Sequence, residues 1–157
     1  MREVQFVWTG EAIVEEVALQ PALSAIADPR LGGREFATAR DELRDLTPAA
    51  LKQSVAEACN AVESALKVLL AEHQVSLPSR QNVDALVASC REAGLFPPAV
   101  DGGGVPIEQI ITGPGRFGKR RGRHGGGTVT HDVGRDEAEA VVAAAAVAIA
   151  FIAKRLP

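Results

Sequence analysis

The feature that most constrains the fold is a regular apolar repeat that begins after Thr47 and Pro48. A hydroxyl residue followed by proline is a typical helix start, because the hydroxyl caps backbone N–H groups and proline suits the first helical position. Apolar residues then recur at intervals of three and four, at Leu51, Val55, Cys59, Val62, Leu66 and Leu69. This spacing predicts one face of a helix of about seven turns, which is long enough to form the centre of a bundle.

Further helices are expected over residues 34–44, over 83–93 with Gly94 at the end, and over 136–153. The last of these contains Ala140–Ala153, which is 14 residues without a polar side chain. A bilayer needs about 20 such residues, whereas a run of this length is typical of a buried core helix. We therefore expect no membrane segment. Because this helix is apolar on nearly every side, we expect one side to form a dimer interface.

The composition favours helices over a β-sandwich, since aromatic residues make up only 4% of the chain and tyrosine is absent. The length of 157 residues suits one domain. We therefore predict a single all-α domain over residues 1–157, built as a bundle of four to five helices. Residues 1–16 are expected to form a short β-hairpin or a domain-boundary segment, with strands near Val4–Trp8 and Ala12–Val14.

The two cysteines, Cys59 and Cys90, both occupy apolar positions of predicted helices. Two separated cysteines without a secretory leader indicate reduced thiols and a cytoplasmic protein.

The chain also has a basic segment, residues 113–127, which holds seven of its 15 glycines and five cationic residues. The cationic residues are Arg116, Lys119, Arg120, Arg121 and Arg123. No acidic residue lies between Glu108 and Asp132, and the net charge of −3 means that the rest of the chain carries −8. We expect residues 106–112 to form a short helix and residues 113–134 to form an exposed loop that binds an anion.

Three kinds of ligand could bind this loop: the phosphate of a nucleotide, a zinc ion, or RNA. Gly113–Lys119 matches the G-x-x-x-x-G-K pattern of phosphate-binding loops, but Arg120 replaces the Ser or Thr that holds magnesium. His124, His131 and Asp132 could bind zinc, yet the neighbouring cations oppose a divalent ion. We therefore expect neither a metal nor a cofactor.

RNA is the third and preferred ligand. A histidine such as His124 titrates near neutral pH and can move a proton to or from a ribose hydroxyl or a leaving oxygen. Arginine can hold phosphate oxygens and stabilise charge that develops on them, while glycine allows close approach of the backbone. Histidine, arginine and glycine are the minimal set of residues for RNA cleavage without a metal, although such loops often bind nucleic acid without cleaving it.

Several segments resemble one known family. Ala58–Lys67 is similar to the "A-x-x-A-x-E-S-x-x-K" helix of abortive-infection C-terminal domains, which belong to the HEPN superfamily. Phe6–Trp8, Gln20–Leu23 and Ala27–Leu31 resemble the segment that precedes that helix in some members. Gly122–Gly127 resembles the family's "R-N-K-x-G-x-H-G-x-G" loop, and an apolar helix follows it.

This resemblance implies a helical bundle that dimerises, with two Arg/His loops around a shared cleft. It also implies metal-independent RNA cleavage within antiviral defence or toxin–antitoxin systems, where a cognate antitoxin or defence partner is expected. By this resemblance His124 is the catalytic histidine, Arg116 or Arg120 the catalytic arginine, and Lys119, Arg121 and Arg123 bind RNA.

The arginine of the family signature is out of register in this sequence. The signature has four to six residues between its Arg and its His, whereas Arg116 is separated from His124 by seven and Arg120 by three. Without gaps, the family Arg falls on Gly118 and the following Asn on Lys119. Three functions therefore remain open: an endoribonuclease, a non-catalytic dimerisation module that binds nucleic acid or protein, and a dimerisation or scaffold domain whose basic loop is only solvated.

Overall fold

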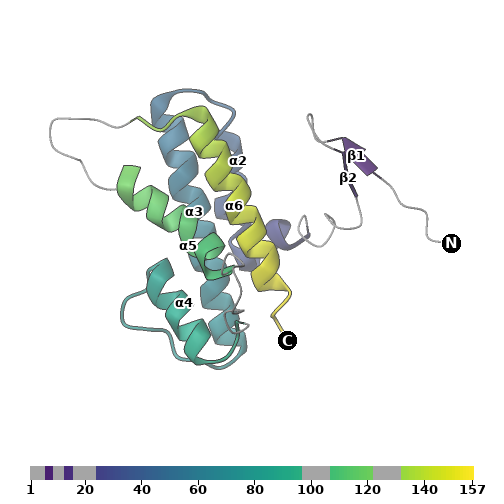
Figure 1. The fold of residues 1–157 in the computed structure, drawn as a ribbon, viewed down its shortest axis with the longest axis vertical. Coiled ribbons are helices and arrows are strands. Elements are labelled where there is room, and N and C mark those ends of the chain that lie inside the picture. Colours follow the sequence, from purple (N-terminus) through teal and green to yellow (C-terminus); the bar gives the residue numbers. More distant parts are fainter. Residues whose placement is uncertain (1–5, 9–12, 16–23, 97–106, 122–131) are drawn as a thin grey trace, which may run out of the picture.

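The computed structural model describes residues 6–8, 13–15, 24–96, 107–121 and 132–157 (Figure 1). Its elements are β1 (Phe6–Trp8), β2 (Ile13–Glu15), η1 (Pro29–Leu31), α2 (Gly33–Glu42), α3 (Pro48–Glu72), α4 (Val83–Glu92), α5 (Ile107–Arg121) and α6 (Arg135–Ala153). Apart from the short hairpin of β1 and β2, these elements are all helical, which confirms the predicted all-α bundle.

Helix α3 forms the centre of the bundle, and α2, α4, α5 and α6 all pack against it (Figure 1). It is 25 residues long and begins where the sequence predicts, with the Thr47 hydroxyl accepting a hydrogen bond from the Ala50 N–H at 3.3 Å. The predicted apolar face is buried except at Cys59, which is half-buried because Ala58 lies deeper in the core.

Helix α2 lies close to α3 because small residues separate them. The turn before α2 passes so near α3 that a Cβ on Gly32 would lie 2.5 Å from the Ala61 carbonyl oxygen. Gly32 also has a φ of +78°, a conformation that favours glycine. The buried Ser54 hydroxyl donates a hydrogen bond to the Ala39 carbonyl at 2.7 Å, which fixes the register of the two helices.

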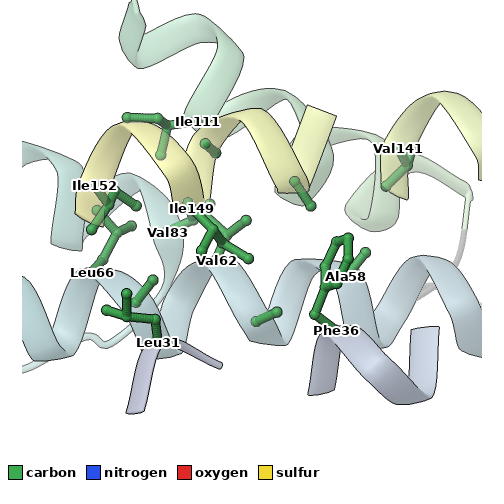
Figure 2. Packing of buried hydrophobic residues seen from close by; sticks show 14 of the residues in the cluster. Leu31, Phe36, Ala58, Val62, Leu66, Val83, Ile111, Val141, Ile149 and Ile152 are labelled. Atoms are coloured by element: carbon green, nitrogen blue, oxygen red, sulfur yellow. The ribbon is translucent and has the colours of Figure 1, made fainter. Parts of the chain in front are cut away.

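Helix α6 covers another face of α3, and Figure 2 shows Val62 and Leu66 of α3 beside Ile149 and Ile152 of α6. All four side chains are almost completely buried. Helix α6 begins without a capping side chain, since Gly134 holds the cap position and donates its N–H to the Glu137 carboxylate at 3.1 Å.

The end of the bundle near the C-terminus is closed by aromatic and basic side chains. The Phe96 and Phe151 rings have centroids 5.8 Å apart, and the Arg155 guanidinium lies 3.5 Å from the centre of the Phe151 ring. His73 Nε2 makes a hydrogen bond of 2.8 Å with the Arg155 carbonyl. This histidine therefore joins the end of α3 to the end of the chain.

The predicted hairpin is confirmed, because β1 and β2 pair antiparallel with Val7 opposite Val14. None of the helices in the described ranges is long and apolar enough to cross a membrane.

Candidate functional site

The first part of the basic segment is helical and does not form a loop. Helix α5 runs from Ile107 to Arg121 and passes through Gly113, Pro114 and Gly115 without ending. The expectations of a short helix that ends at residue 112 and of a loop over residues 113–134 were therefore wrong for residues 113–121. Two glycines and a proline normally break a helix, so contacts with neighbouring helices must stabilise this part of α5.

The packing that maintains this helix is visible at Pro114 and Gly115. Pro114 is almost completely buried, as is Ile111 one turn earlier. A Cβ on Gly115 would lie 2.5 Å from Val83 Cγ1, so only glycine allows α5 this close to α4. At Gly113 a Cβ would meet nothing within 4 Å, but glycine there tolerates the helical conformation that a following proline disfavours.

Helices α4 and α5 run antiparallel, with an ion pair near each end of their contact. At the start of α5, Glu108 accepts hydrogen bonds from Nε and Nη2 of Arg91 near the end of α4, the first at 2.8 Å. These bonds hold the pKa of Glu108 below its ordinary value. Farther along α5, Arg116 Nε lies 3.6 Å from Asp84 Oδ1 in the first turn of α4. The two ion pairs and the Gly115–Val83 contact all lie between α4 and α5, and all three fit the same antiparallel alignment of these helices.

Arg116 is the predicted site residue whose side chain the structure describes. This side chain is 63% exposed, so its guanidinium remains accessible beside Asp84. Lys119, Arg120 and Arg121 lie on the last turn of α5, and Arg120 follows Arg116 by one turn. Helix α5 thus brings together four of the five cationic residues of the basic segment.

Two of the predicted site residues, Arg123 and His124, lie outside the described residues. The predicted proximity of the catalytic histidine to Arg116 or Arg120 therefore stays a prediction.

The helical backbone of residues 113–119 argues against a phosphate-binding loop. A phosphate-binding loop uses N–H groups that are not committed to a helix, whereas residues 113–119 lie within α5. The match of Gly113–Lys119 to the phosphate-loop pattern is therefore coincidental. Cationic residues near the C-terminal end of a helix interact favourably with the negative end of the helix dipole, and the sequence places Lys119, Arg120 and Arg121 in the last turn of α5.

The part of the chain that the structure describes contains no cluster of three His, Cys, Asp or Glu residues with the geometry of a metal site. Asp132, a member of the weighed zinc triad, is exposed at the entrance to α6, and His124 and His131 lie outside the described residues.

Sequence reasoning missed Asp84 as a neighbour of the site. Its only signal is a carboxylate in the first turn of a predicted helix, which usually has a capping role. Its position beside Arg116 depends on how α4 and α5 align, and no local pattern encodes that alignment.

The motif on α3 that resembles the family helix has a structural role in this chain. Ala58 and Ala61 are completely buried, and they allow neighbouring elements to approach α3. The Ser64 hydroxyl donates a hydrogen bond of 3.1 Å to the Glu35 carboxylate on α2. The motif thus helps to hold α2 against α3.

The chain matches the Abi_C family model, which is described as a HEPN-like domain, over residues 34–156. No curated protein and no solved structure matches the chain significantly. The family match spans α2 to α6 and includes both the α3 motif and the basic segment. The chain therefore belongs to the Abi_C family of HEPN-like domains, a family of abortive-infection or nucleic-acid-related modules.

Proposed function

We propose that this domain binds RNA through the basic segment, residues 113–127, as part of an antiviral defence or toxin–antitoxin system. The observation that carries the proposal is the run of five cationic residues with no acidic residue between Glu108 and Asp132, in a chain that is otherwise acidic. Four of these cations follow one another along the last turns of α5. Lysine and arginine side chains can neutralise phosphates of an RNA strand, which makes such binding depend on salt.

We further propose that the domain cleaves the bound RNA without a metal. His124 acts as the general base and general acid, which its pKa range allows near neutral pH. The ribose O2′ loses its proton and attacks the adjacent phosphorus, the bond from phosphorus to O5′ breaks, and the leaving O5′ takes up a proton. The products are a 2′,3′-cyclic phosphate and a 5′-hydroxyl. An arginine stabilises the charge on the pentacovalent phosphate.

Between the two candidate arginines, the packing of α5 favours Arg120 for this role. Arg116 already has the Asp84 carboxylate 3.6 Å from its Nε, so a phosphate must compete with that negative charge. Arg120 lies one turn nearer to the end of α5 and so nearer in sequence to His124. In this account Arg116, Lys119, Arg121 and Arg123 bind the RNA strand, and Arg120 acts at the scissile phosphate.

The test is an RNA cleavage assay in EDTA with the wild-type protein and with the variants His124→Ala, Arg120→Ala and Arg116→Ala. Cleavage should proceed in EDTA, stop in His124→Ala and fall further in Arg120→Ala than in Arg116→Ala. Cleavage that requires a divalent metal, or that persists in His124→Ala, contradicts the mechanism.

The spacing of the arginines favours a second candidate function, a non-catalytic module that binds nucleic acid or a partner protein through the same segment. In this case RNA binding depends steeply on salt while cleavage is absent in every variant. The assay above separates the two functions, because binding without cleavage supports only the second.

We also propose that the domain acts as a homodimer, in which one His124 from each subunit can supply the base and the acid. An apolar strip on α6 that remains exposed supports this proposal. Ala140, Ala143 and Val147 follow one another at helical spacing, and Val147 is 52% exposed. A cognate antitoxin or defence partner would be a further binding partner of this dimer.

A further inference from the structure

A hollow of about 260 Å³ lies between α2 and the start of α6, away from the residues discussed above. Its lining combines three arginines, two leucines and one glutamate: Arg40, Arg44, Arg135, Leu43, Leu46 and Glu139. Pockets for small molecules usually begin at about 300 Å³, so this hollow suits a phosphate group with part of its sugar better than a large ligand.

The arginines of the hollow form only exposed ion pairs with carboxylates, or none within the described ranges. Arg40 makes no ion pair with any residue in the described ranges. Arg44 pairs with Asp41 at 3.2 Å and Arg135 pairs with Glu139 at 2.6 Å, and each pair is exposed and joins neighbours on one stretch of chain. Exposed pairs of this kind contribute little, so a phosphate with more than one negative charge can compete for both arginines.

Tertiary structure brings these arginines together, since Arg40 lies in α2, Arg44 lies in the turn after α2, and Arg135 begins α6. Arginine presents its N–H groups as a planar fork that fits phosphate oxygens, which distinguishes this hollow from a patch of solvated lysines. Leu46 is 56% exposed at the same place and offers an apolar surface to a sugar or a base.

The hollow lies at the end of the bundle where α2 ends and α6 begins. Figure 1 shows the start of α6 beside the connection from α2 to α3. Arg135 is the first residue of α6 and follows the basic segment in sequence.

We propose that this hollow is a phosphate-binding site in which Arg40, Arg44 and Arg135 hold one phosphate group. The phosphate belongs to the RNA strand of the proposed function or to a free nucleotide, and both present the same chemistry to the three guanidinium groups. This deepens the proposed function, on which the choice of RNA rests, whereas the phosphate site itself does not depend on it.

The test compares Arg40→Ala with a matched control, Arg34→Ala, since both arginines are exposed on α2 and only Arg40 lines the hollow. Binding of a fluorescent single-stranded RNA is measured by anisotropy, and binding of a nucleoside monophosphate is measured by calorimetry. Arg40→Ala should weaken the binding of the RNA by about fivefold and lower its salt slope by about 0.7, as the loss of one phosphate contact requires. Arg34→Ala should behave like the wild type.

A second variant, Glu139→Gln, removes the carboxylate that competes for Arg135 and should tighten binding by about twofold to threefold. It serves as an independent check because it predicts a gain, which damage to the fold cannot produce.

The outcomes distinguish the two phosphate sources and the two proposals. Loss of RNA binding in Arg40→Ala assigns the site to the RNA strand, and loss of nucleotide binding alone assigns it to a free nucleotide. If Arg40→Ala changes the binding of neither the RNA nor the nucleotide, the phosphate site is refuted. It is also refuted if the only ligand whose binding depends on Arg40 is an acidic peptide. If the wild type binds the nucleotide but no RNA, the proposed RNA-binding function is refuted, while the proposed phosphate site in the hollow is supported.

Discussion

At the scale of single residues, the course of α5 depends on a glycine that sequence reasoning associates with loops. Gly115 leaves room for Val83, whereas Gly113, two residues earlier on the same helix, has open space where its Cβ would be. The two glycines therefore have different reasons for being glycine. Gly115 is needed for helix packing, and Gly113 is needed for the backbone before Pro114.

We predict that Gly115→Ala lowers the free energy of unfolding by about 1–3 kcal/mol, because the added methyl must displace Val83. Gly113→Ala is the matched control and should change it by less than about 1 kcal/mol, since helix propensity gained there offsets the restriction before proline. Urea unfolding of both variants measures the difference. Equal effects at the two positions would contradict the close contact between α4 and α5.

The Cys90 thiol provides a second prediction at this scale. Burial raises its pKa to about 11, so almost none of it is thiolate at neutral pH. Cys59 is half-buried on α3. In the Cys59→Ala variant, a thiol reagent should therefore react with Cys90 only at the rate at which the protein unfolds. Rapid labelling of Cys90 in the native Cys59→Ala variant would mean that the packing around α4 is open.

At the scale of elements, α5 and its Arg116 are positioned by the pairing of α5 with α4. Arg91 and Glu108 hold the start of α5, while Asp84 lies beside Arg116 farther along. The arginine of each pair is exposed to solvent, so the contribution of each pair to stability is modest and its main effect is on orientation.

The Arg91–Glu108 pair makes part of the stability depend on pH. Because the pKa of Glu108 is lowered in the folded state, its contribution is present above the ordinary value of 4.5 and is lost as the pH falls through the folded value. We predict that Glu108→Gln costs about 0.5 kcal/mol at neutral pH and nothing at strongly acidic pH. Urea unfolding across this range tests it. In an Arg91→Gln background the substitution should have no effect, and a cost independent of pH would refute the pairing.

The neighbouring pair leads to a prediction about function. Replacing Asp84 by Asn removes the negative charge 3.6 Å from Arg116 Nε. If Arg116 binds RNA, this substitution should strengthen RNA binding by about twofold to fivefold, the size of an exposed ion pair. In an Arg116→Gln background the gain should disappear. A gain that survives in that background would show that Asp84 repels RNA directly and does not act through Arg116.

The elements also show what the sequence could and could not predict. The long helix α3 and the apolar helix α6 follow from spacing and composition, because each must bury a face against others. The continuation of α5 through Pro114 could not be predicted, because contacts from α4 override the local preference of Gly and Pro. For the same reason, neither the position of Asp84 nor the hollow at Arg40 can be read from local patterns.

At the scale of the whole molecule, the bundle has two contrasting regions on its surface. One is the cationic end of α5, and the other is the apolar strip on α6 that includes Ala140, Ala143 and Val147. A dimer formed through the strip would bury apolar surface that is otherwise exposed to water and would bring two basic segments into one assembly.

If the domain forms the proposed dimer through this strip, Val147→Glu should convert it to a monomer, because a carboxylate in an apolar interface is buried without a partner. Light scattering coupled to size-exclusion chromatography measures the mass. Leu77→Glu is the control, since Leu77 is 43% exposed in the connection between α3 and α4. If Val147→Glu stays dimeric, the interface lies elsewhere on the molecule.

The central claim, that the basic segment binds the RNA backbone, is tested most directly by the salt dependence of RNA affinity. The measurement compares the wild type with a variant in which Arg116, Lys119, Arg120, Arg121 and Arg123 are all replaced by Gln. A control variant replaces Arg34, Lys52 and Arg80, which are exposed elsewhere on the bundle. If all five residues contact phosphates, the slope of log affinity against log salt should fall by about 3.5 in the first variant. The control should keep the slope of the wild type, and an unchanged slope in the first variant would contradict the claim.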